Sequence, residues 1–286
     1  MSHMTAIAIW CNTEVPGSPM LWAAADSRVS SHDQRSSRKT IIDDAVKIMG
    51  LPLIARAPDP SGFFSEVYYA HTVGYAFAGS SLMGQNAYLA LVPLLSNLIS
   101  LERRPPALAD VADYVARLLN RTFDETKHRG KESLFEVAIF GFCSCRQSLA
   151  TYHFAPNASV ETRGGMAIKM TPCENLKDQD FIYLGDNKAS MRDAVEKAFK
   201  GPNVPGRPAS RAPRYVIADC IEDVSCGSIG GDLQLAIADR EGFRPLALLK
   251  PRVIGTPEAY LSYLGHELDQ SMQQVGSLGI GVKGMA

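Results

Sequence analysis

Two apolar segments near the start of the chain constrain its fold more than any other feature. Residues 5–11 and 21–27 are apolar on both faces of an extended strand, which is typical of strands that are covered on both sides of a sheet. The sequence Val-Pro-Gly-Ser-Pro at residues 15–19 is typical of a turn. We therefore predict a hairpin in a sheet that carries packed layers on both faces.

The end of this predicted hairpin holds a polar pair. If the two segments pair symmetrically about the turn, the partners sum to 31 and Thr5 lies opposite Asp26, with Cβ atoms roughly 5 Å apart. A hydroxyl beside a carboxylate at the end of an apolar sheet suggests a catalytic nucleophile. Lys47 stands among the apolar residues Val46 and Ile48, where it needs a carboxylate partner because desolvation would otherwise discharge it. Strand geometry makes Asp26 the nearest candidate.

The rest of the chain alternates between strand patterns and helix patterns. No break in composition divides it, so we predict a single domain over residues 5–286, with helices outside two packed sheets. The predicted strands are 45–49, 66–79 (as one strand or two), 134–143, 149–154, 166–170, 181–184, 232–238 and 243–249, and residues 51–62 are a Pro/Gly-rich stretch between the first two. The predicted helices are 81–101, with Ser80 or Ser81 as its cap, and 108–126, 189–199, 214–222 and 257–270.

Composition and charge exclude several classes of protein. The 286 residues are 46% hydrophobic with a net charge of -1, which favours neither nucleic acid nor an anionic membrane as a partner. The most apolar stretch, residues 87–101, is interrupted by polar residues and is shorter than the ~20 residues of a membrane span. The start of the chain lacks the pattern of a signal peptide, so we expect a cytoplasmic protein. No Cys or His spacing predicts a metal, and no cofactor is expected.

Five short segments occur in an order that is typical of one family. They are Thr5-Ala-Ile-Ala-Ile, Ala24-Ala25-Asp26-Ser27-Arg28, Val46-Lys47-Ile48, Ala76-Phe77-Ala78-Gly79 and Ser228-Ile229-Gly230-Gly231. In these segments the chain resembles the proteasome β-subunit family and its bacterial relatives among the N-terminal-nucleophile hydrolases. The resemblance implies an α+β fold, a four-layer αββα sandwich with two mostly antiparallel sheets between helix layers. It also implies a peptide or amide substrate, no cofactor, and a homo-oligomer that is possibly ring-shaped.

The resemblance assigns a role to each matched position. Thr5 is the nucleophile, and its own free α-amine is the base that accepts the hydroxyl proton. The Lys47 charge lowers the pKa of that hydroxyl, and Asp26 keeps Lys47 ionised. The Gly79 amide donates to the oxyanion at the start of a helix. Four residues have supporting roles, namely Ser27, Arg28, Asp186 and Ser228.

Two segments depart from the pattern of the family. Asp186 follows Gly185 where the family has a serine, and no alignment of residues 225–231 places the family's Asp and Ser in register. Asp186 or Asp223 substitutes for the missing groups, or the catalytic support is degenerate. Two alternatives therefore stay open, which are a catalytically inactive assembly or binding protein and a small-molecule amidase. Ser228 also stands in an incomplete nucleophile-elbow pattern that lacks its first glycine.

The residues before Thr5 bear on the mechanism. An amine locked in the Met4–Thr5 peptide bond cannot act as a base. Residues 1–4 are interpreted as a cloning remnant or a propeptide, with Met4 as the initiator. Removal of a Met that precedes a small residue then exposes Thr5. A chain that keeps residues 1–4 is expected to be inactive.

Overall fold

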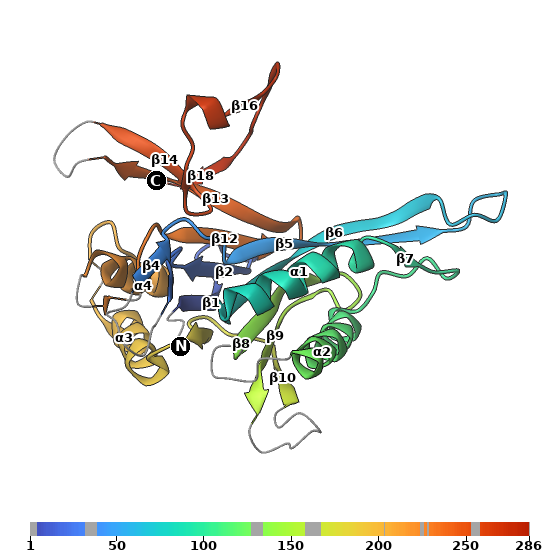
Figure 1. The fold of residues 1–286 in the computed structure, drawn as a ribbon, viewed down its shortest axis with the longest axis horizontal. Helices are drawn as coiled ribbons and strands as arrows, with labels where there is room; N and C mark the ends of the chain where they lie inside the picture. Colours follow the sequence, from blue (N-terminus) through green and yellow to red (C-terminus); the bar gives the residue numbers. More distant parts are fainter. Residues whose placement is uncertain are drawn as a thin grey trace.

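The computed structural model describes residues 5–31, 39–126, 134–157, 167–202, 204–223, 226–227, 229–252 and 258–285. The sequence led to predictions that involve Met1–Met4, Ser225 and Ser228, and these residues lie outside the described part of the chain. The described chain is a mixed α+β fold with two large sheets and four α-helices (Figure 1). No helix among the described residues is long and apolar enough to cross a membrane.

The first sheet is built around the predicted N-terminal hairpin. Every residue of its strand β1 is buried, which agrees with the prediction that both faces are covered. In spatial order the sheet contains β11 (Phe181–Gly185), β1 (Ala6–Asn12), β2 (Met20–Ala25), β12 (Gln234–Asp239), β13 (Gly242–Pro251), β14 (Ala259–Tyr263) and β15 (His266–Glu267), and β18 (Lys283–Met285) pairs with β13.

The register of the hairpin corrects the predicted one by a single residue. Ile7 pairs with Ala25 and Asn12 pairs with Met20, so the partners sum to 32 and not to 31. The connection between the strands, residues 13–19, has an odd number of residues. The hairpin is therefore symmetric about a residue and not about a peptide bond. A slip of one residue exchanges the two faces of a strand, so Thr5 and Asp26 are not directly opposed.

The second sheet contains six strands, and one of them, β5, extends further along the chain than the sequence predicted. Residues 51–57 belong to the Pro/Gly-rich stretch, for which no strand was predicted, but β5 runs through them. Pro52 is tolerated there because β7 pairs with β5 only at Ala55 and Arg56, which leaves the edge beside Pro52 without a partner strand. In spatial order the strands are β10 (Ala167–Glu174), β9 (Ser148–Asn157), β8 (Phe135–Cys143), β6 (Glu66–Gly79), β5 (Ile48–Ala57) and β7 (Leu98–Ile99).

Three apolar clusters hold the sheets and helices together. One lies between the second sheet and helices α1 (Ser81–Leu95) and α2 (Leu108–Glu125). Another lies between the first sheet and helices α3 (Lys188–Lys200) and α4 (Ala212–Glu222). The third joins residues of both sheets, such as Ile9 and Phe140. Both sheets are therefore packed on two sides.

The end of the chain differs most from the prediction. The expected helix over residues 257–270 is wrong, because the described part of that segment forms β14 and β15. Leu264 and Gly265 between these strands both have positive φ, 56° and 86°, the conformation of a tight hairpin turn. Helix α1 also ends earlier than expected, at Leu95, before the polar pair Ser96-Asn97. Four short strands, β3 (Val29–Ser31), β4 (Lys39–Ile42), β16 (Gln274–Val275) and β17 (Leu278–Gly279), form two small ladders, and η2 (Ala209–Arg211) and η4 (Gln270–Met272) are 3-10 turns.

Candidate active site

Lys47 joins two of the predicted site residues in a buried cluster. Its ammonium Nζ lies 2.8 Å from Asp26 Oδ1, 3.3 Å from Thr5 Oγ1 and 2.7 Å from the Arg28 carbonyl oxygen. Lys47 and Asp26 are 1% and 0% exposed, and Thr5 is 5% exposed. An ammonium has three donors, and here each one has an acceptor. The structure thus places Thr5, Asp26 and Lys47 in contact.

The Asp26 carboxylate accepts further hydrogen bonds from the backbone. The Ala6 amide donates to Oδ1 at 3.0 Å and the Gly230 amide donates to Oδ2 at 3.2 Å. The Asp26 amide donates in turn to the Ala6 carbonyl at 3.2 Å, directly after the end of β2. The negative charge is therefore fixed by two strands and by the Gly230 segment before β12.

Burial governs the protonation of the lysine. Removal of the ammonium from water lowers the pKa of Lys47 below its ordinary value of 10.5, and the charge of Asp26 opposes that shift. An ammonium in hydrogen-bond contact with a hydroxyl stabilises the oxyanion that forms when the hydroxyl loses its proton. The cluster can thus make Thr5 Oγ1 a better nucleophile.

Gly185 and Asp186 lie against the backbone of Thr5. The Asp186 amide donates to the Thr5 carbonyl at 3.1 Å. Gly185 has φ +109°, and a Cβ at this position would lie 1.7 Å from the Thr5 carbonyl oxygen, so only glycine fits. The hydroxyl of Tyr183 donates to the Asp186 carbonyl at 2.9 Å. This segment therefore fixes the backbone that carries the Thr5 hydroxyl.

Ser27 and Arg28 connect the end of β2 to neighbouring segments. Their amides donate to the Gly230 carbonyl at 3.1 and 3.0 Å. The Ser27 hydroxyl donates to the Asp43 carbonyl and accepts from the Asp232 amide at 2.6 Å. The guanidinium Nε of Arg28 lies 2.6 Å from the Asp43 carboxylate. Both residues hold the backbone around Asp26.

Two other predicted residues lie at the ends of secondary-structure elements. Gly79 ends β6, has φ +90° and stands just before Ser80 and α1. A Cβ there would lie 2.5 Å from the Leu134 carbonyl oxygen, so this turn requires glycine. Its role as an oxyanion donor stays a prediction. Asp223, the suggested substitute, is exposed at the end of α4, with the Cys226 thiol 3.9 Å from its carboxylate.

Sequence reasoning missed one residue of the site. Gln234 of β12 is 1% exposed and makes three hydrogen bonds with the segment that carries Lys47. The available signal was a single amide in an otherwise apolar strand, Leu-Gln-Leu-Ala-Ile-Ala, residues 233–238. A buried amide needs polar partners, but the strand pattern alone does not say which.

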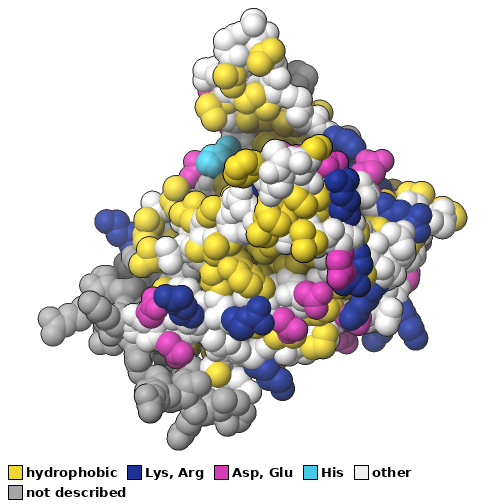
Figure 2. All heavy atoms as spheres, turned by 90° about the vertical axis from the view of Figure 1, so that its right-hand side faces the viewer, with side chains coloured by type: hydrophobic (Ala, Val, Ile, Leu, Met, Phe, Trp, Pro, Cys, Tyr) yellow, Lys and Arg dark blue, Asp and Glu magenta, His cyan; other side chains and the backbone are white. Residues whose placement is uncertain are grey.

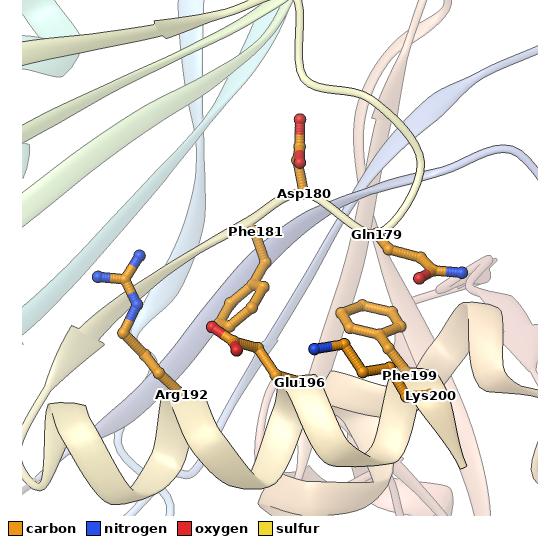
Figure 3. A pocket seen from close by; sticks show the side chains of 7 residues that line it. All are labelled: Gln179, Asp180, Phe181, Arg192, Glu196, Phe199 and Lys200. Carbon is orange, nitrogen blue, oxygen red and sulfur yellow. The ribbon is translucent and has the colours of Figure 1, made fainter.

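Two further features of the described residues concern metal binding and a pocket on another part of the surface. Among the described residues, no group of three or more His, Cys, Asp or Glu side chains is placed to hold a metal ion. Figure 3 shows a pocket between α3 and the start of β11, where the Phe181 and Phe199 rings lie 6.0 Å apart. The Arg192 guanidinium lies 5.7 Å from the centre of the Phe181 ring. None of the predicted site residues lines this pocket.

Comparison with known proteins supports a fold and no family. No protein-family model matches the sequence, and no curated protein matches it. One similar structure, the helical assembly of the Anbu complex from Pseudomonas aeruginosa, has a TM-score of 0.51 and 13% identity, with 91% of this chain and 86% of that chain covered. Another, Anbu (ancestral beta-subunit) from Yersinia bercovieri, has a TM-score of 0.51 and 13% identity, with 84% of this chain and 86% of that chain covered.

These findings correct the family assignment made from the sequence. The resemblance to proteasome β-subunits rested on short segments, whereas no family model matches and the structural neighbours are Anbu proteins. Short apolar strands and glycine turns recur in many sheet proteins, so such segments identify a family poorly. At 13% identity the comparison shows a fold shared with the Anbu structures and leaves the chemistry to be argued from the site.

Proposed function

We propose that this protein is a threonine-type N-terminal-nucleophile hydrolase that cleaves peptide or other amide bonds. Residues 5–286 would form one domain, arranged as a four-layer αββα sandwich. The proposal depends chiefly on the contact of the buried Lys47 ammonium with both Thr5 Oγ1 and the Asp26 carboxylate. Burial of a lysine costs free energy of desolvation. A catalytic role for the neighbouring Thr5 hydroxyl would explain why a charged residue occupies this buried position.

The proposed reaction uses Thr5 as both nucleophile and base. The free α-amine of Thr5 takes the hydroxyl proton, and Oγ1 adds to the carbonyl carbon of the substrate to form a tetrahedral intermediate. The resulting α-ammonium gives its proton to the leaving amine as the carbon–nitrogen bond breaks, which leaves the acyl group on Oγ1 as an ester. Water then hydrolyses the ester and restores the hydroxyl. Lys47 stabilises the attacking oxygen, and the Gly79 amide would donate to the oxyanion of the substrate.

The labelling of Thr5 by an electrophile tests this proposal directly. A chain that begins at Thr5, treated with a β-lactone or a peptide vinyl sulfone, should gain one covalent adduct on that residue, located by peptide mass spectrometry. Thr5→Ala should remain unlabelled. If Thr5 is not labelled and no peptide or acyl amide is cleaved, the protein is instead an inactive assembly or binding protein. Cleavage of acyl amides without cleavage of peptides would identify a small-molecule amidase.

We further propose that the protein forms a homo-oligomer through helix α1 and the segment that follows it. The helix contains no charged residue, yet Leu89 and Leu94 are 67% and 44% exposed, and Ile99 and Leu101 beyond it are 62% and 76% exposed. Figure 2, which looks onto the right-hand end of Figure 1, shows hydrophobic side chains grouped at the centre of that face. Exposed apolar patches of this kind mark association surfaces.

A charge placed on this surface is expected to dissociate the oligomer. Leu89→Glu would put a desolvated carboxylate into the apolar contact, so light scattering should report a smaller particle than for the unmodified protein. Leu249→Glu is the matched control, because Leu249 is 61% exposed on β13, away from α1. A strict monomer before any substitution, or equal masses for both variants, would contradict this proposal.

A further inference from the structure

The buried side chain of Gln234 links the first sheet to the backbone of the segment that carries Lys47. Its side-chain oxygen accepts from the Lys47 amide at 3.0 Å and from the Ile48 amide at 3.3 Å, and its Nε2 donates to the Ala45 carbonyl at 2.6 Å. Gln234 belongs to β12 and pairs with Ala25, the residue before Asp26. One buried side chain thus binds the segment at residues 45–48 to the strand next to β2.

This connection matters because the catalytic cluster spans two sheets. Thr5 and Asp26 lie at the ends of strands of the first sheet, whereas Lys47 directly precedes β5 of the second sheet. Any movement between the sheets would change the distance from the ammonium to Thr5 Oγ1. Gln234 and the bond from the Ala45 amide to the Ser27 carbonyl, 2.9 Å, fix the Lys47 backbone to the first sheet.

We propose that Gln234 is a positioning residue that holds Lys47 at its distance from the Thr5 hydroxyl and Asp26. This inference rests on the proposed hydrolase function and adds a residue to it. Gln234 acts through the backbone of Lys47, so it should influence the rate of the chemical step and not the binding of substrate. Misplacement of a catalytic group by about 1 Å costs about 100-fold in rate.

The first test compares two buried amides in chains that begin at Thr5. Gln234→Leu should lower kcat about 100-fold and leave KM within about twofold. Asn12→Leu is the matched control, since Asn12 is 1% exposed and bonded to the Ser210 carbonyl at 3.0 Å, at the other end of β1. It should lose stability to urea and keep its kcat. Equal kcat values for Gln234→Leu and the unmodified chain would overturn the inference.

Gln234→Glu offers a second test through pH. A protonated carboxyl group reproduces the acceptor and the donor of the glutamine amide, whereas the ionised form has no donor for the Ala45 carbonyl. Burial raises the pKa of a carboxyl group. The activity of this variant, relative to the unmodified chain, should therefore be near normal at low pH and fall as pH rises. Relative activity that does not change with pH would contradict the proposed hydrogen-bond role.

A third measurement does not need turnover. In protein with 13C-labelled lysine, the titration midpoint of Lys47 is followed by NMR, with Lys47→Met to assign the signal. In Gln234→Leu that midpoint should fall, because Lys47 loses its fixed place beside Asp26, whose negative charge raises the pKa of the lysine. An unmoved midpoint would refute the inference even if the protein proves inactive. An inactive unmodified chain whose Lys47 midpoint does move in the variant would refute only the hydrolase function.

Discussion

A chain that begins at Thr5 is expected to hydrolyse amides about 100- to 10,000-fold faster than a chain that retains Met1–Met4, which is the range attributed to general-base catalysis. In the longer chain the Thr5 nitrogen belongs to a peptide bond and cannot take the hydroxyl proton. An ordinary α-amine has a pKa of about 8 and acts as a base only when it is unprotonated, so the rate of the shorter chain should rise with pH as its α-amine loses its proton. Initial rates on peptide and acyl amide substrates, with the N-terminus verified by mass spectrometry, measure the difference.

Two substitutions in the shorter chain serve as controls. Thr5→Ser keeps a hydroxyl and an α-amine and should retain activity, whereas Thr5→Ala keeps only the amine and should show none. Equal rates from the shorter chain and from a chain with Met1–Met4 demonstrably attached would refute the mechanism, because the base would then have to be a different group.

The sequence predicted the parts of the fold that depend on local patterns. The buried strands at each side of the first turn, the long strand β6 and helix α2 all follow from apolar periodicity. The end of the chain did not follow, because Tyr260, Leu261 and Tyr263 suit a strand or a helix equally well by spacing. Pairing with β13 decided in favour of the strand, and the spacing of apolar residues within the segment does not reveal a partner strand.

The contact between Lys47 and Asp26 could be predicted from the sequence, whereas the register of the hairpin could not. A lone lysine in an apolar segment demands a carboxylate partner, and that argument selected Asp26 correctly. The assumed register was wrong by one residue. Asp26 and Thr5 still both contact Lys47, because Thr5 directly precedes β1, Asp26 directly follows β2, and the lysine side chain is long. Gln234 could not be found this way, because its partners are backbone groups of the other sheet.

Removal of one partner of the buried ion pair is expected to destabilise the protein strongly. Asp26→Asn leaves the Lys47 ammonium without its counter-charge, which should lower the free energy of unfolding by about 3–5 kcal/mol. Lys47→Met should cost less, because the Ala6 and Gly230 amides still donate to the Asp26 carboxylate. Urea unfolding measures both, and each variant should lose its hydrolase activity.

The double variant Asp26→Asn/Lys47→Met separates stability from catalysis. It buries no charge at either position, so its loss of unfolding free energy should be smaller than the sum of the two single losses, by about 0.5–3 kcal/mol. Its activity should not recover, since no ammonium remains beside Thr5 Oγ1. If the two losses simply add, the charges are not coupled and the buried pair does not stabilise the fold. If activity returns together with stability, Lys47 serves the architecture alone, and the chemistry must be sought away from the contact between the two sheets.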